Sequence, residues 1–151
     1  MAAWRGGSAA VGAPGLPLHV TLLHPFVPAA AADASVEAAV RAVLAGVAPF
    51  RFSLARLERF PGVLYLAPEP AEPFVALTGK LHARWPEHRP YDGAYDSVIP
   101  HLTVAFGADA QAPTDGLERL LPIEAAARSL WLMAEGWNGR WSTRARFRLG
   151  G

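Results

Sequence analysis

Two tetrapeptides in this chain follow one pattern, and they constrain its fold more than any other feature. The first is His-Val-Thr-Leu at residues 19–22, and the second is His-Leu-Thr-Val at residues 101–104. In each, His and Thr alternate with aliphatic residues, which is the period of two of a half-buried β-strand. If the two strands lie side by side, two imidazoles and two hydroxyls converge on one small volume. The pattern therefore predicts a site for an anion at which protons are moved.

Each motif taken alone has a purely structural explanation. A His in an apolar neighbourhood is often a satisfied structural residue, and Thr is a good strand former. The repetition favours a functional role, because the chain has only five His and two of them open the same tetrapeptide. The flanks also correspond, since a Pro stands shortly before each motif (Pro17, Pro100) and a Phe shortly after it (Phe26, Phe106).

The length and composition of the chain predict a single globular domain. Of its 151 residues, 52% are hydrophobic and 18% are charged, which is enough apolar material for a substantial core. No stretch approaches the roughly eighteen continuous apolar residues of a membrane helix, and residues 1–14 lack the apolar block of a signal peptide. We therefore expect a cytoplasmic protein with no membrane partner.

The charge of the chain and its lack of Cys exclude several classes of function. A net charge of +1 does not suit a protein that grips a long nucleic acid through many phosphates. The absence of Cys excludes disulfides, thiolate catalysis and Cys-based metal sites. We expect a monomer that does not bind DNA and whose partner is a small anionic phosphodiester or an RNA end.

Gly and Pro divide the chain into a lead-in and one domain. Residues 1–17 are punctuated by them and are predicted to be irregular, whereas residues 18–151 form a single domain. Within it, apolar residues recur either at helical spacing or with a period of two, and Trp-Asn-Gly at 137–139 is a hairpin signal. The predicted helices cover residues 33–44, 73–85 and 114–121, and the predicted strands cover 18–23, 50–57, 63–67, 101–104, 126–134 and 141–149.

The two halves of the chain match when the second is shifted onto the first. The two motif His are 101 − 19 = 82 residues apart, and the same shift moves residues 50–57 onto 132–139 and residues 63–67 onto 145–149. Each half thus reads as a motif strand, a helix and a hairpin, present in two copies. We predict a bilobal α+β fold, in which a pseudo-two-fold duplicated unit of antiparallel β-sheets is flanked by helices and the motifs meet in a central cleft.

The residues in the motifs suit acid–base chemistry on a phosphodiester. Imidazole takes up and releases a proton near neutral pH, so one His can accept a proton from an attacking group while the other protonates the leaving oxygen. The Thr hydroxyls can donate hydrogen bonds to the remaining phosphate oxygens. No third metal ligand stands near either His, and Thr is a poor zinc ligand, so we expect neither a metal nor another cofactor.

These motifs resemble those of the 2H phosphoesterase superfamily, and in particular of its bacterial 2′-5′ RNA ligase-like proteins. The resemblance covers nearly all of the chain from about Leu16 and includes HVTLLHPFVP at 19–28, FPGVLYLAPEP at 60–70 and VIPHLTVAFG at 98–107. It implies a bilobal α+β fold and metal-independent chemistry on RNA 2′,3′-cyclic phosphates or 2′-5′ linkages.

By motif position, the resemblance also implies roles for four residues. His19 and His101 would be the acid and the base, in an order that the sequence leaves open, and Thr21 and Thr103 would bind the phosphate. Relatives usually have a further strand before the first motif, whereas eighteen residues precede it here, so we expect an incomplete lobe or a start further upstream.

Four aromatic residues are candidates for the substrate pocket. Phe26 and Phe106 follow the two motifs, and Tyr91 and Tyr95 lie in the loop that leads into the second one. The two Tyr could stack on a nucleobase, although loop Tyr residues pack against their own scaffold at least as often. Phe106 stands where RNA-acting relatives often carry Arg, which leaves room for a smaller or more apolar substrate.

Three functions fit this sequence. The first is a phosphodiesterase, or a ligase that catalyses the reverse reaction, with two His as acid and base. The second is a non-catalytic module that keeps the pocket and binds an anion or a nucleotide. The third is an enzyme that tailors a metabolite without phosphate and uses the same two His.

Overall fold

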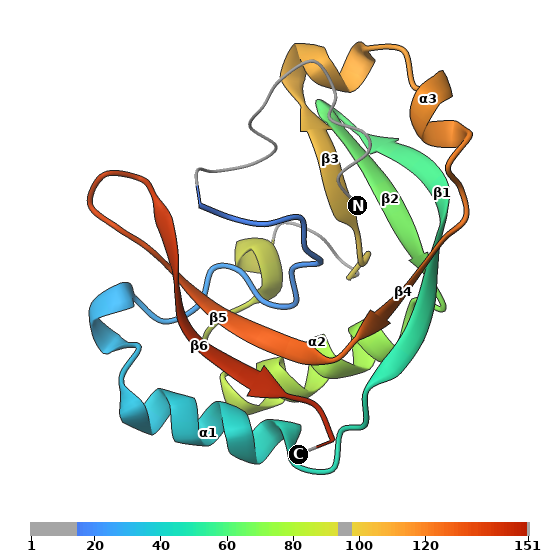
Figure 1. Cartoon of the computed structure of the whole chain (residues 1–151). Coiled ribbons are helices and arrows are strands. Elements are labelled where there is room, and N and C mark those ends of the chain that lie inside the picture. The colour runs from blue at the N-terminus through green and yellow to red at the C-terminus, as the bar shows by residue number, and fades with distance from the viewer. Residues whose placement is uncertain (1–14, 94–97, 151) are drawn as a thin grey trace.

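The computed structural model describes residues 15–93 and 98–150, and for Tyr91 and Asp92 it describes the backbone alone. Most of the predicted lead-in, residues 1–14, therefore lies outside the described residues. Figure 1 shows the arrangement of the elements. In chain order they are η1 (Ala29–Ala31), α1 (Ala34–Leu44), β1 (Phe50–Phe60), β2 (Val63–Glu69), α2 (Glu72–Arg84), η2 (Pro90–Gly93), β3 (Leu102–Phe106), η3 (Gly107–Gln111), α3 (Asp115–Glu118), β4 (Ile123–Ala127), β5 (Ser129–Glu135) and β6 (Trp141–Arg148).

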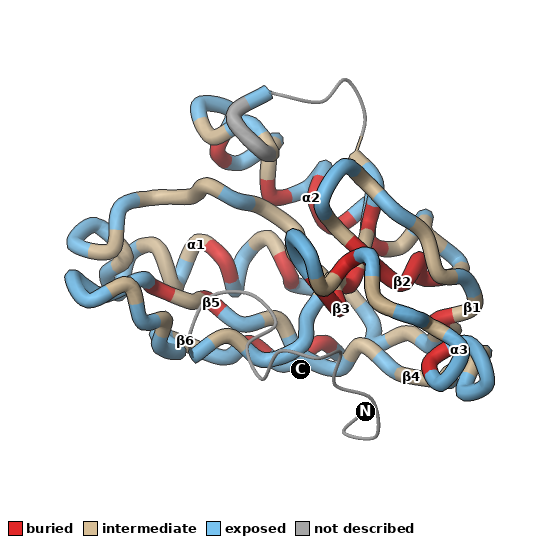
Figure 2. The backbone as a smooth tube through the Cα atoms, turned by 90° about the horizontal axis from the view of Figure 1, so that it is seen from above, coloured by how far each residue is buried: buried red, intermediate tan, exposed pale blue. Residues whose placement is uncertain are grey.

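The strands form two antiparallel sheets. One has four strands in the order β3-β2-β1-β4, and the other is the β5–β6 hairpin. Figures 1 and 2 show α1 and α2 along one side of the β5–β6 sheet. None of the helices in residues 15–93 and 98–150 is long and apolar enough to cross a membrane.

Each sheet has its own core, which confirms the prediction of a bilobal α+β fold of antiparallel sheets. The helical core joins α1 and α2 to the β5–β6 sheet, and the sheet core lies under β1, β2 and β3. The buried residues of the helical core are Val40, Leu44, Leu77, Leu81, Trp85, Leu132, Phe147 and Leu149. Those of the sheet core are Leu54, Leu64, Leu66, Leu102, Val104, Ala105, Ala110 and Leu117.

The two longer helices begin and end close to where the sequence predicts. The side chain of Asp33 caps α1 by accepting hydrogen bonds from the backbone N–H groups of Ser35 and Val36, at 3.0 and 3.1 Å. Pro73 stands in the first turn of α2, where its missing N–H has no cost, and Pro86 follows the helix.

Three predicted elements are wrong in extent. Residues 18–23 do not form a strand, because the chain bends at residues 22–25 and Val20 makes only an isolated bridge. The predicted strand at 126–134 is two strands, β4 and β5, that pair in different sheets on either side of Arg128. The predicted helix at 114–121 is helical only in α3, because the chain then tightens into i+3 hydrogen bonds ahead of Pro122.

The duplicated hairpins are present, and the two halves of the chain are interleaved. The shift of 82 residues carries the first residues of β1 and β2 into β5 and β6. However, β3, from the second half, pairs with β2 of the first half. The segment around the first motif in turn contacts β6, since the ring of His24 lies 6.0 Å from that of Trp141. Each motif therefore lies beside the hairpin of the other half.

Candidate active site

The two motifs lie side by side, as the sequence predicts. Val20 and Leu102 form an antiparallel bridge, and they are also equivalent under the shift, because 102 − 20 = 82. Each motif thus pairs with its own copy at the matching residue. That is the contact expected if a two-fold axis passes between two antiparallel segments.

The bridge also decides which way the motif side chains face. Val20 and Leu102 both pack into the sheet core, so the alternating His and Thr residues project to the opposite face, which we call the site face. If the register of the bridge is continued by one residue on either side, it would place His19 opposite Thr103 and Thr21 opposite His101. Directly opposite residues have Cβ atoms about 4.5–5.5 Å apart and diagonal ones about 7–8 Å. In that register the two imidazoles would be diagonal and within reach of one small anion.

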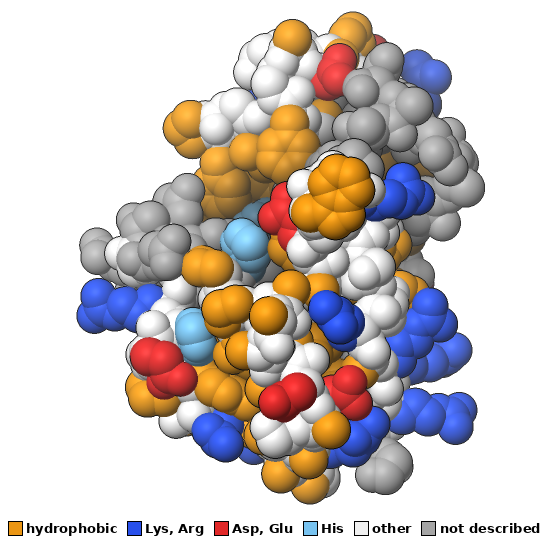
Figure 3. Space-filling model, turned by 90° about the vertical axis from the view of Figure 1, so that its left-hand side faces the viewer, with side chains coloured by type: hydrophobic (Ala, Val, Ile, Leu, Met, Phe, Trp, Pro, Cys, Tyr) orange, Lys and Arg blue, Asp and Glu red, His pale blue; other side chains and the backbone are white. Residues whose placement is uncertain are grey.

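Solvent reaches this arrangement. His19 is exposed, and Thr21, His101 and Thr103 are half-buried. Figure 3 shows His side chains at the surface among hydrophobic ones, on the side of the molecule that is at the left in Figure 1. The motif side chains are therefore not sealed behind the core.

Both motif imidazoles are held in the same way. Nδ1 of His19 lies 2.6 Å from the carbonyl oxygen of Pro17, and Nδ1 of His101 lies 2.8 Å from that of Ile99. A carbonyl oxygen can only accept, so in the neutral ring Nδ1 carries the hydrogen and Nε2 has the lone pair in both His. Nε2 of His19 lies 3.1 Å from the hydroxyl oxygen of Thr21. In both motifs the acceptor is the carbonyl two residues before the His.

The first motif is fixed by contacts other than strand pairing. The buried hydroxyl of Thr78, on α2, donates a hydrogen bond of 2.7 Å to the carbonyl oxygen of Leu22. Gly15 approaches the backbone of Trp141 so closely that an added Cβ would lie 2.1 Å from its carbonyl oxygen. These contacts hold the motif in place although it is not a strand.

A bulge in β3 turns Phe106 to the site face. Tyr65 pairs with Thr103, but the next residue of β2 toward its start, Leu64, pairs with Ala105, so β3 contains one extra residue, Val104. Val63 and Phe106 then pair on the same face as Tyr65 and Thr103. Phe106 is 47% exposed. Without the bulge, simple alternation would place Phe106 on the opposite face from Thr103.

The remaining pocket candidates do not all reach this face. Phe26 packs against the helical core, with its ring 4.8 Å from that of Trp85 and 5.7 Å from that of His88. Tyr91 lies in η2, and its side chain is outside the description. Tyr95 lies outside the described residues.

Two residues at the site face were missed in the sequence. The rings of Phe60 and Tyr65 stack on each other at 4.4 Å, and both contact the ring of His101, at 5.3 and 5.5 Å. Both stand in the segment 60–70, where a Phe before a Pro-Gly turn and a Tyr in an apolar run look like ordinary hairpin residues. The signal that could have found Tyr65 is its position opposite a motif Thr, which requires the strand register.

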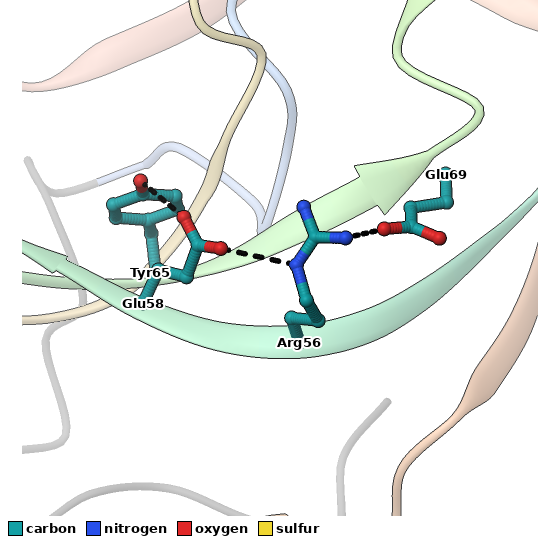
Figure 4. Close-up of polar contacts among 4 residues, drawn as sticks. All are labelled: Arg56, Glu58, Tyr65 and Glu69. Carbon is teal, nitrogen blue, oxygen red and sulfur yellow. Dashed lines mark hydrogen bonds and ion pairs between the residues drawn. The ribbon is translucent and has the colours of Figure 1, made fainter.

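Charged residues of β1 and β2 extend the site face away from the motifs. The hydroxyl of Tyr65 donates to Glu58 at 3.0 Å, Arg56 donates to the same carboxylate at 3.0 Å, and Arg56 also pairs with Glu69 (Figure 4). Burial, followed by the hydrogen bond and the charge of Glu58, raises the pKa of Tyr65 to about 12. The hydrogen bonds from Arg56 and Tyr65 lower the pKa of Glu58. At neutral pH the phenol is thus a donor and Glu58 an anion.

Within residues 15–93 and 98–150, no group of three or more His, Asp or Glu side chains could hold a metal ion. The contacts described for the other three His do not involve His19 or His101. His24 contacts Trp141, Nδ1 of His82 lies 3.2 Å from the carbonyl oxygen of His88, and His88 contacts Phe26.

Comparisons with known proteins agree with this geometry. The family model described as "2′-5′ RNA ligase superfamily" matches residues 1–137. No curated protein sequence matches the chain. Among solved structures, a phosphoesterase is 20% identical with a TM-score of 0.61 and covers 93% of this chain and 83% of its own.

Two further structures have similar scores. Escherichia coli LigT complexed with 3′-AMP is 18% identical, with a TM-score of 0.61 and coverage of 97% of this chain and 86% of its own. The protein TT0787 of Thermus thermophilus is 26% identical, with a TM-score of 0.62 and coverage of 91% and 82%. Because the family model spans most of the sequence and these structures share the fold, the chain belongs to the 2′-5′ RNA ligase superfamily of 2H phosphoesterases.

Proposed function

We propose that this protein is a phosphodiesterase, or a ligase that catalyses the reverse reaction, and that it uses His19 and His101 as acid and base without a metal. Its substrate would be a 2′,3′-cyclic phosphate or a 2′-5′ phosphodiester of RNA or of a small nucleotide. The observation that carries the proposal is the pairing of two motifs that each hold a His by the same Nδ1 contact. Family membership supports a phosphoesterase or ligase in general, and the substrate is our inference.

In the hydrolytic direction, the two His would move two protons. Nε2 of one His takes a proton from a water molecule as its oxygen attacks phosphorus. The bond from phosphorus to the leaving ribose oxygen breaks, and Nε2 of the other His gives that oxygen a proton. Each transfer contributes typically about 10²–10⁴-fold in rate. Ligation is the same step in reverse, with the roles of the two His exchanged.

Thr21 and Thr103 would bind the phosphate. The continued register of the bridge would put each opposite the His of the other motif, so that both hydroxyls could donate to non-bridging oxygens of a phosphate held between the imidazoles. Such donors stabilise the charge that develops in the transition state. When a phosphate oxygen accepts a hydrogen bond from the Thr21 hydroxyl, the contact of that hydroxyl with Nε2 of His19 would break.

The substrate is most simply a nucleotide. Escherichia coli LigT is complexed with 3′-AMP in its solved structure, and by analogy a ribonucleotide phosphate would bind between the two His of this chain. The exposed ring of Phe106, on the same sheet face, would contact an apolar or aromatic part of the substrate. Tyr91 and Tyr95 remain candidates for the same role.

Hydrolysis of the four nucleoside 2′,3′-cyclic phosphates, with EDTA present, tests the proposal. We expect turnover by the wild type, and a loss of about 10²-fold or more in His19→Ala and in His101→Ala. His82→Ala is the matched control, because the contact described for His82 is with the carbonyl oxygen of His88, away from both motifs. Full activity in both site variants would overturn the proposal. Nucleotide binding without turnover would support the non-catalytic module instead.

A cytoplasmic monomer that binds neither DNA nor membranes completes the proposal. The net charge of +1 supports the absence of long nucleic acid partners. The molar mass in solution, measured by light scattering, checks the monomer. A stable dimer would contradict that part and leave the chemistry unaffected.

A further inference from the structure

We propose that Tyr65 is a positioning residue for His101, and that Glu58 and Arg56 hold Tyr65 in place for this task. The inference rests on the proposed function, because it concerns the same acid–base pair. It adds a set of residues outside both motifs.

The ring of His101 stands against a pair of aromatic rings. Phe60 and Tyr65 are stacked, with an angle of 22° between their planes. The imidazole meets both edge to face, at 86° to Phe60 and 66° to Tyr65. The hydrogen bond from Nδ1 to Ile99 fixes one edge of the imidazole, and the aromatic pair restricts rotation of the rest.

Tyr65 is in turn held by charged groups. It stands directly opposite Glu58 in the β1–β2 pairing, and its hydroxyl donates to that carboxylate. Arg56 holds the other oxygen of Glu58 and pairs with Glu69 on its far side. Figure 4 shows the four side chains in a row over β1 and β2. The phenol ring therefore has a fixed position and a fixed plane.

This network is not needed to fill the sheet core. Tyr65 is only 3% exposed, but it alternates with Leu64 and Leu66, which pack into the sheet core on the other face. A buried hydroxyl costs free energy unless it is paired, and an apolar side chain of similar size would need no such partner. A hydrogen-bonded Tyr at this position is explained if its ring serves to orient His101.

Variants of Tyr65 test the inference through kcat on the cyclic phosphates. A shift of about 1 Å in a reacting group can cost about 10²-fold in rate. We expect Tyr65→Leu to lower kcat by about 10- to 100-fold, with KM changed by no more than about twofold. Tyr65→Phe, which keeps the ring but loses the hydroxyl, should lose less. The matched control is Phe52→Leu, because Phe52 belongs to the same sheet but contacts Phe50 and Phe74.

A second measurement does not depend on catalysis. In the full chain, proton–nitrogen correlation spectra of the His side chains report the tautomer and the ring environment of His101. We expect Tyr65→Leu to shift the ring signals of His101 and to leave those of His24 unchanged. Should Tyr65→Leu fail to fold, Glu58→Gln serves in its place, with Glu124→Gln of the same sheet as its control. Glu58→Gln should lower kcat severalfold and shift the same signals.

The outcomes separate this inference from the proposed function. Full activity in His19→Ala and His101→Ala overturns the proposed function, and the spectra still test whether Tyr65 orients His101. If those two variants lose activity while folded Tyr65→Leu keeps the kcat and the His101 signals of the wild type, the inference alone is overturned.

Discussion

The hydroxyl of Thr78, in the middle of α2, donates a 2.7 Å hydrogen bond to the carbonyl oxygen of Leu22, the last residue of the first motif. The two residues are 56 positions apart in sequence, and Thr78 is 2% exposed. A helix of the helical core thus helps to position the first motif. In a regular strand, this carbonyl would accept a hydrogen bond from a neighbouring strand instead.

Replacing Thr78 by Val keeps the shape of the side chain and removes this donor. We expect the free energy of unfolding to fall by about 1–3 kcal/mol, because the Leu22 carbonyl loses its partner. Turnover should fall as well, since the first motif is less firmly held. Urea unfolding and the cyclic phosphate assay measure the two effects. Thr143→Val is the control, because Thr143 is exposed and its hydroxyl meets only the sulfur of Met133 among the bonds described.

Gly15→Ala should destabilise the protein more than Gly46→Ala. Both glycines have positive φ, 92° and 80°, so both substitutions strain the backbone. Only at Gly15 would the new Cβ also meet another part of the chain, at 2.1 Å from the carbonyl oxygen of Trp141, whereas Gly46 has open space around it. Thermal unfolding of the two variants compares them. Equal losses would mean that the approach of Gly15 to β6 has no role in stability.

The cap of α1 should make stability depend on pH in acid. The hydrogen bonds of Asp33, first from the Ser35 hydroxyl and then from the Val36 N–H, lower its pKa from the ordinary 3.8. A lowered pKa in the folded state means that the stabilisation is present above the ordinary value and is lost as pH falls through the folded one. The melting temperatures of wild type and Asp33→Asn should therefore differ at neutral pH and converge in acid. A difference that is constant with pH would contradict this.

Tyr65 should ionise late. Burial and Glu58 raise the pKa of Tyr65 to about 12, so its neutral form stabilises the fold below the ordinary value of 10.0, and this contribution is lost as pH rises through about 12. The absorbance of the phenolate, recorded after rapid mixing into alkali and before the protein unfolds, measures this ionisation. Tyr65→Phe should remove the late step, and Glu58→Gln should move it to lower pH. A wild type without a late step would refute the shift.

Local patterns were enough to predict the elements whose ends are set by their own residues. Asp33 caps α1, Pro73 begins α2, and Gly139 forms the turn between β5 and β6 with a positive φ of 74°. The proximity of the motifs was also predictable, because equivalent residues of a duplicated unit meet at its axis, as Val20 and Leu102 do.

The elements that could not be predicted depend on distant partners. Residues 18–23 alternate like a strand, but Thr78 and the isolated bridge take up their backbone groups. Residues 126–134 look like one run rich in Leu, Trp and Met, although the chain changes sheets at Arg128. Tyr65 lies beside His101 only because β2 pairs with β3 in one register. None of these partners is visible within a short window of sequence.

The interleaving of the halves decides when the site can first exist during synthesis. A nascent chain that ends after α2 has β2 with an open edge and one of its two His-Thr motifs. Emergence of β3 closes that edge and supplies His101, and emergence of β6 then provides the surface against which Gly15 and His24 settle. The proposed activity would therefore be acquired only once β6 has emerged, and we expect chains truncated before β6 to lack it.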